Sequence, residues 1–451
     1  MQLAAKSDKP QDPANETPLQ NASRARRIAL LLTDFFLGQG ALQGTNILIA
    51  LFLVRNLSVS NYAKFGLASG FQFTAAVLMD LGYASTIIPL VGARVSDRSL
   101  VGRYVRAALA HRNRLFWVLS PVAATAFLFV THRQHWSWST QFILLVSVLL
   151  ALYSSGKVSC FGAPLILYRR LRAYYGPQTI SGLSRLGIYF VLRAIGALNA
   201  WSASALLALN VFSDGYFLGR KSKQSIVWPN TEDPSTQEEI HRYVLPATPA
   251  IILGAFHGQV ALFLIGVFGS TISIAQVAAL GRLGHIFNLM MTFNIVIVEP
   301  YFARLSRHGL LRAYLKFIAV ATLGAVAISV FSFSFPGVFL WPLGPQYAQL
   351  RPLIGWVVLT ACITYVAGLI WIMNRSRKWL FWRGSIAEVG LLVIVQIGFV
   401  VRFGMRDTWH AVMFNFASSF CYLVAHTYVA IHGFRKGESI ADADEIAQPI
   451  P

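Results

Sequence analysis

Nine ionisable side chains stand inside or at the edges of long apolar runs of this sequence. A charged group in the hydrocarbon core of a membrane is costly, so each is a functional candidate, with an internal ion pair as the alternative explanation. Intramembrane carboxylates are also the groups that form proton relays and ion-coupling sites. The carboxylates are Asp34, Asp80, Asp214, Glu299 and Glu388, and the cations are Lys157, Arg185, Arg193 and Arg282.

Two polar stripes accompany these charges. In the first apolar run, polar residues recur at steps of four and three, which places Gln39, Gln43 and Asn46 on one helical face. The second stripe has steps of four, three and four, with Arg282 at its edge, and consists of Gly281, His285, Asn288 and Thr292. A polar face on a membrane helix lines either water or the polar groups of another helix. The stripes fall in opposite halves of the chain, so an aqueous cleft between the halves would explain both, with hydrogen bonds between helices as the alternative.

The composition places these residues in a helical membrane protein. The chain is 55% hydrophobic and 12% charged, whereas about 25% charged is usual in a soluble domain. Its apolar runs are long enough to cross a hydrocarbon core of about 30 Å, and continuous runs of this kind indicate helices. The net charge of +20 does not indicate nucleic-acid binding, because the basic residues fall in short loops between spans. We therefore predict an all-α polytopic protein.

Twelve spans are expected, divided into two halves. The predicted spans are 28–54, 65–92, 115–131, 140–167, 179–198, 201–219, 243–268, 274–298, 313–335, 351–374, 384–401 and 408–434. The only long hydrophilic break, 220–242, separates 28–219 from 243–434, and the tails 1–27 and 435–451 are expected to be disordered. A weak internal repeat supports this division, since Ala93-Arg94 matches Ala303-Arg304 and Tyr104 matches Tyr314 at an offset of 210. Related halves of this kind occur in many transporters.

The loop charges predict the orientation. Counted from the sequence, 26 lysines and arginines fall in the loops that lie on the same side as the termini, and six fall on the other side. Basic loops stay in the cytoplasm, so both termini are predicted to be cytoplasmic. Enzyme motifs are weak: Gly38-Gln-Gly40-Ala-Leu-Gln-Gly44 lies inside a span, and His132 and His135 have no acidic partner. No catalytic constellation, metal site or bound cofactor is predicted.

Three turns resemble those of a known family. Val54-Arg-Asn-Leu-Ser-Val-Ser-Asn-Tyr-Ala-Lys-Phe-Gly66 is similar to the turn after the first span of bacterial polysaccharide flippases, although Ala63 stands where that family usually has glycine. Met79-Asp-Leu-Gly-Tyr-Ala-Ser85 and Leu343-Gly-Pro-Gln-Tyr-Ala348 resemble two further segments of the same family. These flippases are the O-antigen and exopolysaccharide branch of the multidrug/oligosaccharidyl-lipid/polysaccharide exporter superfamily.

The resemblance implies two six-helix lobes around a central cavity that opens alternately to either side. It also implies that an oligosaccharide on undecaprenyl pyrophosphate crosses the bacterial inner membrane for lipopolysaccharide or exopolysaccharide synthesis, with a polymerase and chain-length proteins as partners. Pyrophosphate needs fixed cations, and the fork of arginine fits phosphate oxygens. Arg185, Arg193, Arg282 and Lys157 are the available cations, while the two stripes offer partners for sugars.

Other functions stay open. In an ion-coupled small-molecule exporter of the same superfamily, Asp34, Asp80, Asp214 or Glu388 would couple transport to a proton or sodium gradient. A membrane polysaccharide polymerase or glycosyltransferase is disfavoured because the longest outside segment, 336–350, is short. A scaffold without transport activity would not need a polar face in each half.

Overall fold

The structure is a computed structural model, and it describes residues 18–91, 94–231, 233–245, 248–257, 259–305, 309–377, 379 and 382–446, with most of their side chains. Helices occupy nearly all of this length, and no strand occurs in the described ranges. The helices of the first half are α1 (Pro18–Asn56), α2 (Val59–Asp80), α3 (Tyr83–Val91), α4 (Arg98–Arg133), α5 (Trp138–Leu167), α6 (Leu171–Ala194) and α7 (Ala200–Lys223). They form an N-lobe.

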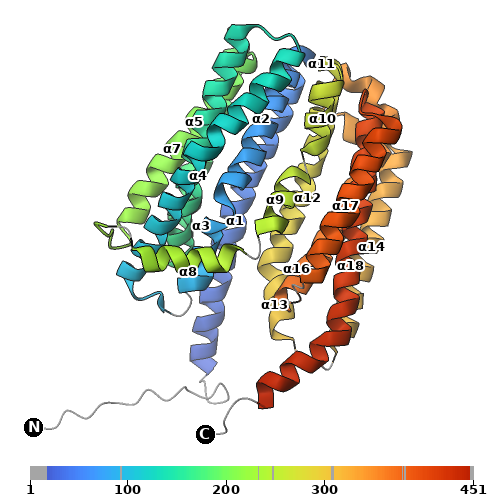
Figure 1. Cartoon of the computed structure of the whole chain (residues 1–451). Helices are drawn as coiled ribbons and strands as arrows, with labels where there is room; N and C mark the ends of the chain where they lie inside the picture. The colour runs from blue at the N-terminus through green and yellow to red at the C-terminus, as the bar shows by residue number, and fades with distance from the viewer. Residues whose placement is uncertain are drawn as a thin grey trace, which may run out of the picture.

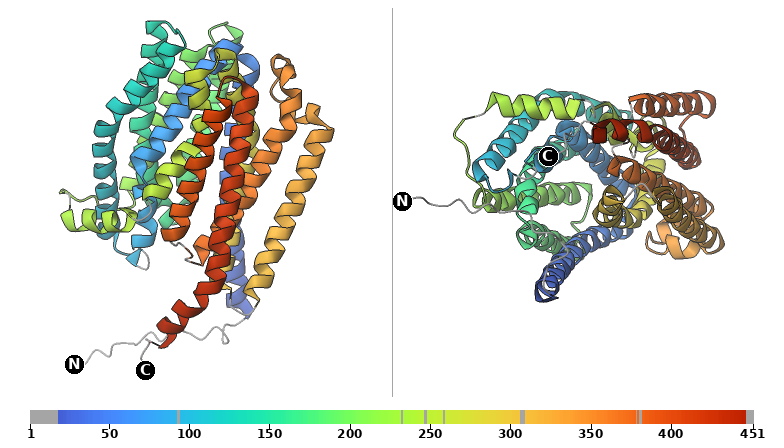
Figure 2. Two further views of the ribbon diagram at one scale, coloured as in Figure 1. Left: turned by 45° about the vertical axis from the view of Figure 1, so that its right-hand side comes forward. Right: turned by 90° about the horizontal axis from the view of Figure 1, so that it is seen from below.

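The second half forms a C-lobe that stands beside the first (Figures 1 and 2). Its helices are α9 (Thr248–His257), α10 (Val260–Phe268), α11 (Thr271–Gly281), η4 (Arg282–Gly284), α12 (His285–Phe293), the π-helical η5 (Asn294–Val298), α13 (Glu299–Arg304), α14 (Leu310–Ser334), α15 (Pro336–Leu340), η6 (Pro345–Leu353), α16 (Ile354–Ser376), α17 (Trp382–Phe403) and α18 (Thr408–Ile446). Taken singly, six described helical segments have the length and hydropathy to cross a membrane. In order and direction the helices follow the twelve predicted spans.

Among the described residues, the lobes share an apolar core at one end only. We call the end where α1 begins and α18 finishes the terminus end, at the bottom of Figure 1, and the opposite end the far end. At the far end one buried cluster joins both lobes, from Leu53 and Tyr62 of the N-lobe to Ile265 and Tyr347 of the C-lobe. At the terminus end the clusters are separate, one around α3, α4 and α5 and one around α13, α14 and α16. The molecule is therefore closed at the far end and divided at the terminus end, where α9 still packs against α2.

Glycines let the lobes approach closely at the far end. A Cβ atom on Gly66 of α2 would lie 2.6 Å from the Cβ of Ala278 on α11. One on Gly266 of α10 would lie 2.9 Å from a methyl group of Val130 on α4. Small residues at helix crossings are the usual way in which membrane helices pack, because the lipid supplies no hydrophobic drive for association.

Corresponding helices of the two lobes begin and break at corresponding places. Ser58 caps α2 and accepts the N–H of Asn61, and Ser270 caps α11 and accepts the N–H of Ser273, an offset of 212. The first lobe then breaks at Leu81-Gly82, where both residues have positive φ (44° and 84°). With the same offset this break falls at the beginning of the π-helical segment 294–298.

The structure differs from the predictions at the ends of helices. Residues 18–27 and 435–446, expected to be disordered, continue α1 and α18. The basic segment 94–114, expected to be a loop, becomes α4 from Arg98 onward, because the side chain of Asp97 accepts the N–H groups of Ser99 and Leu100. These arginines therefore lie on a helix.

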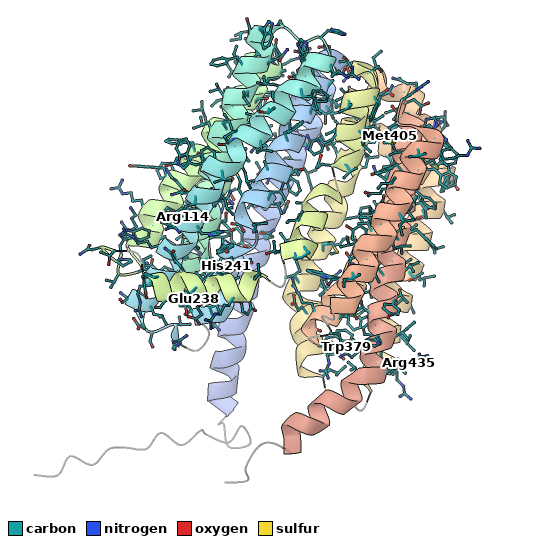
Figure 3. All side chains as sticks on the ribbon, viewed as in Figure 1. Arg114, Glu238, His241, Trp379, Met405 and Arg435 are labelled. Atoms are coloured by element: carbon teal, nitrogen blue, oxygen red, sulfur yellow. The ribbon has the colours of Figure 1, made fainter. Side chains whose placement is uncertain are left out.

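The linker between the lobes contains an amphipathic helix, α8 (Pro234–Val244), which crosses the terminus end of the N-lobe (Figure 1). Its Ile240 and Val244 are buried in the N-lobe cluster. Its polar side faces tyrosines of the same lobe: the hydroxyl of Tyr83 lies 2.7 Å from Nδ1 of His241, and Tyr104 donates to Glu239. Figure 3 labels Glu238 and His241 along this helix. The linker is thus fixed to the N-lobe, which was not predicted.

Candidate functional site

Arg282 lies where the two lobes meet. It follows α11 directly, in the short η4 turn that contacts α1 and α16. Its Nε donates to the hydroxyl of Tyr62 on α2 at 3.0 Å. One Nη lies 3.5 Å from Oγ of Ser69, which is about two turns further along the same helix. The side chain is half-buried. A cation of the C-lobe is therefore held against the N-lobe, next to α1.

Arg185 approaches α1 from the other side. It projects from α6, where its side chain is buried, and one Nη donates to Oδ1 of Asn46 on α1 at 3.3 Å. Its Nε has no acceptor among the described residues. Arg185 and Arg282 thus both reach polar groups of α1 or of elements packed on α1, and Asn46 is the residue of the predicted stripe that makes the contact.

The other two predicted cations lie elsewhere. Arg193 is exposed near the far end of α6, where its Nε donates to Oδ1 of Asn56 at 3.1 Å, and its place in a cavity stays a prediction. The sequence gives the face of a helix but not the depth at which a residue lies. The ammonium of Lys157 sits 4.3 Å from the ring centre of Tyr153 on the same helix, α5. No described contact joins Lys157 to Arg185 or Arg282.

The predicted polar stripes are only partly described. Gln39 and Gln43 are half-buried on α1, and Thr292 is half-buried on α12. The side chains of His285, Asn288 and Asp34 lie outside the described residues, so their roles stay predictions.

Asp80 has a partner that the sequence analysis did not identify. Its Oδ1 lies 3.2 Å from Nη1 of Arg112 on α4, whose other Nη donates to Oγ of Ser155 on α5 at 2.8 Å. Arg112 is only 3% exposed. A Cβ atom on Gly156 would lie 1.9 Å from Nε of Arg112, so that glycine makes room for the guanidinium. Arg112 was counted with the basic loop, and only the early start of α4 places it inside the N-lobe.

Asp214 lies in a cluster of neutral polar groups between α6 and α7. One carboxylate oxygen accepts the hydroxyl of Ser181, and the other accepts Nδ2 of Asn210 at 3.1 Å. The side chain of Asn210 also donates to Ser181 at 2.8 Å. Within the described residues no arginine or lysine forms an ion pair with Asp214. Its carboxylate is therefore held in place by hydrogen bonds to neutral side chains.

Glu388 has a neighbouring imidazole. Its Oε2 lies 3.8 Å from Nδ1 of His426, which is buried on α18. Glu299, in contrast, forms a two-pronged ion pair with Arg375 of α16, whose guanidinium also covers the ring of Trp371 at 4.5 Å. The structure thus supports the alternative explanation for Glu299, an internal pair that holds helices together.

Two of the three turns that carry the family resemblance meet at the far end. Tyr62 of the first turn and Tyr347 of the third are fully buried, with ring centres 6.3 Å apart across the lobes. The side-chain amide of Gln346 donates to the carbonyl of Val54, and the guanidinium of Arg55 lies 5.1 Å from the ring centre of Trp341. These residues were predicted only as a likeness, and their shared role in closing the far end comes from the structure.

A second set of hydrogen bonds closes the far end beside the first. The side-chain amide of Gln134, which follows α4, donates to the carbonyls of Gly266 and Gly269 at 2.9 and 3.0 Å. Its carbonyl accepts the hydroxyl of Thr271 at 3.1 Å. One N-lobe side chain thus satisfies the end of α10 and the beginning of α11.

Comparisons with known proteins support the architecture. No family model and no curated protein matches the chain. Among solved structures, the lipid II flippase MurJ in an inward closed conformation matches with a TM-score of 0.65 and 11% identity, over 90% of this chain and 87% of that one. An inward-facing multidrug resistance MATE family transporter of the MOP superfamily matches at 0.59 and 13%, over 88% and 95%. A MATE protein in complex with MaD3S matches at 0.58 and 14%, over 91% and 96%.

These matches extend over both lobes. Because the sequence identities are low, the matches show a similarity of fold and nothing beyond it. The first of these structures is described as inward closed and the second as inward-facing. The chain has the all-α, two-lobed membrane fold of the MATE and MurJ structures.

Proposed function

We propose that this protein moves an oligosaccharide linked to undecaprenyl pyrophosphate across the cytoplasmic membrane by alternating access. The observation that carries the proposal is the arrangement around α1, where Arg185 and Arg282 approach from opposite lobes in a molecule closed at one end only. A pyrophosphate is doubly or more highly charged, and paired guanidinium forks suit its oxygens better than lysine does.

The other parts of the substrate have matching surroundings. The sugar needs amide and hydroxyl partners, which Gln39, Gln43 and Asn46 offer along α1. The polyprenyl tail stays in lipid while the head crosses. The far end is closed by Gln134, Gln346 and the Tyr62–Tyr347 contact. These contacts would break when the lobes rock the other way, and the head would then be released to the periplasmic leaflet. A polymerase and chain-length proteins would then take the product.

Coupling to an ion gradient is assigned to the carboxylates that form no ion pair with an arginine or a lysine. Asp80 is held by Arg112 in a buried pair, which indicates a structural role. Asp214 and Glu388 have no arginine or lysine partner in the described part of the chain. We therefore favour Asp214 and Glu388 over Asp80, with Asp34 still a candidate.

A transport assay separates this function from the alternative exporter. Purified protein in liposomes should move undecaprenyl-pyrophosphate-linked oligosaccharide between leaflets, and protein with both Arg185→Ala and Arg282→Ala should not. The matched control is Arg193→Ala, an exposed arginine on the same helix as Arg185. Gradient-driven release of a cationic dye, with no movement of the lipid-linked sugar, would favour the small-molecule exporter instead.

The orientation is tested with single cysteines. Ser137 and Gln349 are exposed at the far end, and Ser99 and Gln224 are exposed at the terminus end. With cytoplasmic termini, a membrane-impermeant maleimide added to intact cells should label cysteine at the first two positions only. The native cysteines Cys160, Cys362 and Cys421 are buried, so the background should be low. Labelling at Ser99 from outside would reverse the proposed direction.

A further inference from the structure

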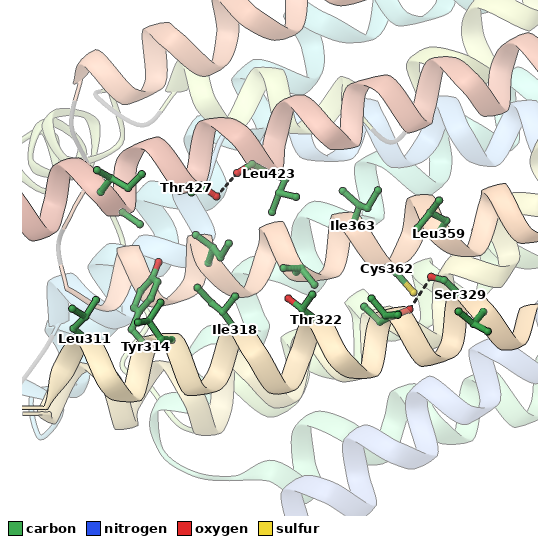
Figure 4. A pocket seen from close by; sticks show the side chains of 18 of the residues that line it. Leu311, Tyr314, Ile318, Thr322, Ser329, Leu359, Cys362, Ile363, Leu423 and Thr427 are labelled. Atoms are coloured by element: carbon green, nitrogen blue, oxygen red, sulfur yellow. Dashed lines mark hydrogen bonds between the residues drawn. The ribbon is translucent and has the colours of Figure 1, made fainter.

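An apolar groove of about 710 Å³ runs along the C-lobe, away from the arginines described above. Helices α14 and α18 form its walls and α16 its floor (Figure 4). On α14 the lining begins at Leu311 and ends at Phe333, so the groove follows nearly the whole helix. On α18 it begins at Leu423 and ends at Phe434, so the second wall is present only toward the terminus end.

Three of the polar side chains that line the groove already have hydrogen bonds within the protein. Thr427 donates to the carbonyl of Leu423 on its own helix at 2.7 Å, and Ser329 donates to the carbonyl of Ala325 at 2.8 Å. Tyr314 donates to Asn374 at 2.8 Å. Most of the remaining lining is apolar, with Thr322 as a further hydroxyl, so hydrocarbon suits the groove better than a sugar or a polar helix.

The dimensions fit one hydrocarbon chain. Residues 311–333 of α14 extend over roughly 33 Å, so a volume of about 710 Å³ leaves a cross-section of roughly 20 Å². A helix about 10 Å wide would need roughly 80 Å². The two-walled part, residues 423–434 of α18, is roughly 16 Å long, close to half of a hydrocarbon core of about 30 Å. A lipid chain from one leaflet has this reach.

Two arginines lie at the terminus end of the groove. Arg312 follows the lining residue Leu311 on one wall, and Arg435 follows Phe434 on the other. Both arginines are exposed, and neither has an ion-pair or hydrogen-bond partner among the described residues. Figure 3 shows Arg435 at this end of α18.

Two other arginines near this end are already used in the protein. Arg375 is paired with Glu299, and Arg377 donates to the carbonyls of Phe302 and Leu305 at 3.3 and 3.0 Å. We propose that the groove binds one acyl chain of an anionic glycerophospholipid, whose phosphate is held by Arg312 and Arg435. This lipid is a structural component of the C-lobe, and the inference does not depend on the transported substrate.

The test is native mass spectrometry of the purified full-length protein after exchange into vesicles of phosphatidylglycerol or phosphatidylcholine. The wild type should retain one phosphatidylglycerol. Leu315→Trp, which fills the groove, should lose it, whereas Leu323→Trp, also exposed on α14 but outside the lining, should keep it. Replacing both Arg312 and Arg435 with glutamine should weaken phosphatidylglycerol binding by about fivefold per charge. As a control, Arg220→Gln, at an exposed position of α7, should leave this binding unchanged.

Three results would overturn the inference. Equal retention by the two tryptophan variants would place the lipid outside the groove. Unchanged phosphatidylglycerol binding in the Arg312→Gln/Arg435→Gln protein would remove the headgroup site. A lipid-free dimer that Leu315→Trp dissociates would mean that a second copy of the chain occupies the groove.

Discussion

Replacing Arg282 with alanine is expected to reduce transport of the lipid-linked oligosaccharide about hundredfold, because a hydrogen-bonded charge that meets a phosphate is worth up to about 3 kcal/mol. Protein levels should stay normal, since the side chain is half-buried and not part of the apolar core. Arg282→Lys should retain part of the activity, because lysine keeps the charge and loses the bidentate fork. Transport is measured as movement between leaflets in liposomes.

A matched variant separates the charge from the closure of the far end. In this conformation Arg282 also holds the hydroxyl of Tyr62, so its loss could act by weakening the contact between lobes. Tyr62→Phe removes that hydrogen bond and leaves the charge in place. We expect Tyr62→Phe to transport at near-normal rates. If it is as impaired as Arg282→Ala, Arg282 acts through closure of the far end, and Arg185 would remain the cation assigned to the pyrophosphate.

The sequence predicts the helices well because the membrane imposes strong limits on the chain. Apolar runs of fixed minimum length define the spans, and turn residues such as Asn199 mark the separations. The predicted division between the fifth and sixth spans is supported: α6 ends at Ala194, and Asn199 caps α7 with a reciprocal capping box to Ser202. Capping chemistry is local, so it can be read from neighbouring residues.

The site is predicted less well because it depends on depth and on pairing. Arg185 and Arg193 differ by eight residues along one helix, and their spacing does not say that the first is buried and the second lies at the far end. Arg112 has the sequence context of a cytoplasmic loop, and only its tertiary contacts with Asp80 and Ser155 place it inside the lobe. Neither property has a periodic signal in the sequence.

The Asp80–Arg112 pair gives the largest expected effect on stability. Removing one member of a buried pair leaves an uncompensated charge, which costs about 3–5 kcal/mol. Asp80→Asn should therefore strongly lower the free energy of unfolding in detergent, because Arg112 is 3% exposed and its guanidinium would lose its carboxylate. Gly156→Ala should also destabilise the protein, since a Cβ there would meet Nε of Arg112 at 1.9 Å.

The double variant Asp80→Asn/Arg112→Met tests whether the loss comes from the stranded charge. Replacing both members of a buried pair with neutral groups is often close to neutral, so this protein should recover most of the lost stability. The control is Glu299→Gln, whose pair with Arg375 is more exposed, with side chains 24% and 34% accessible. It should cost about 1 kcal/mol or less. A different result would change the assignment of Asp80: if Asp80→Asn unfolds like the wild type but loses the pH dependence of transport, then Asp80, and not Asp214 or Glu388, carries the coupling proton.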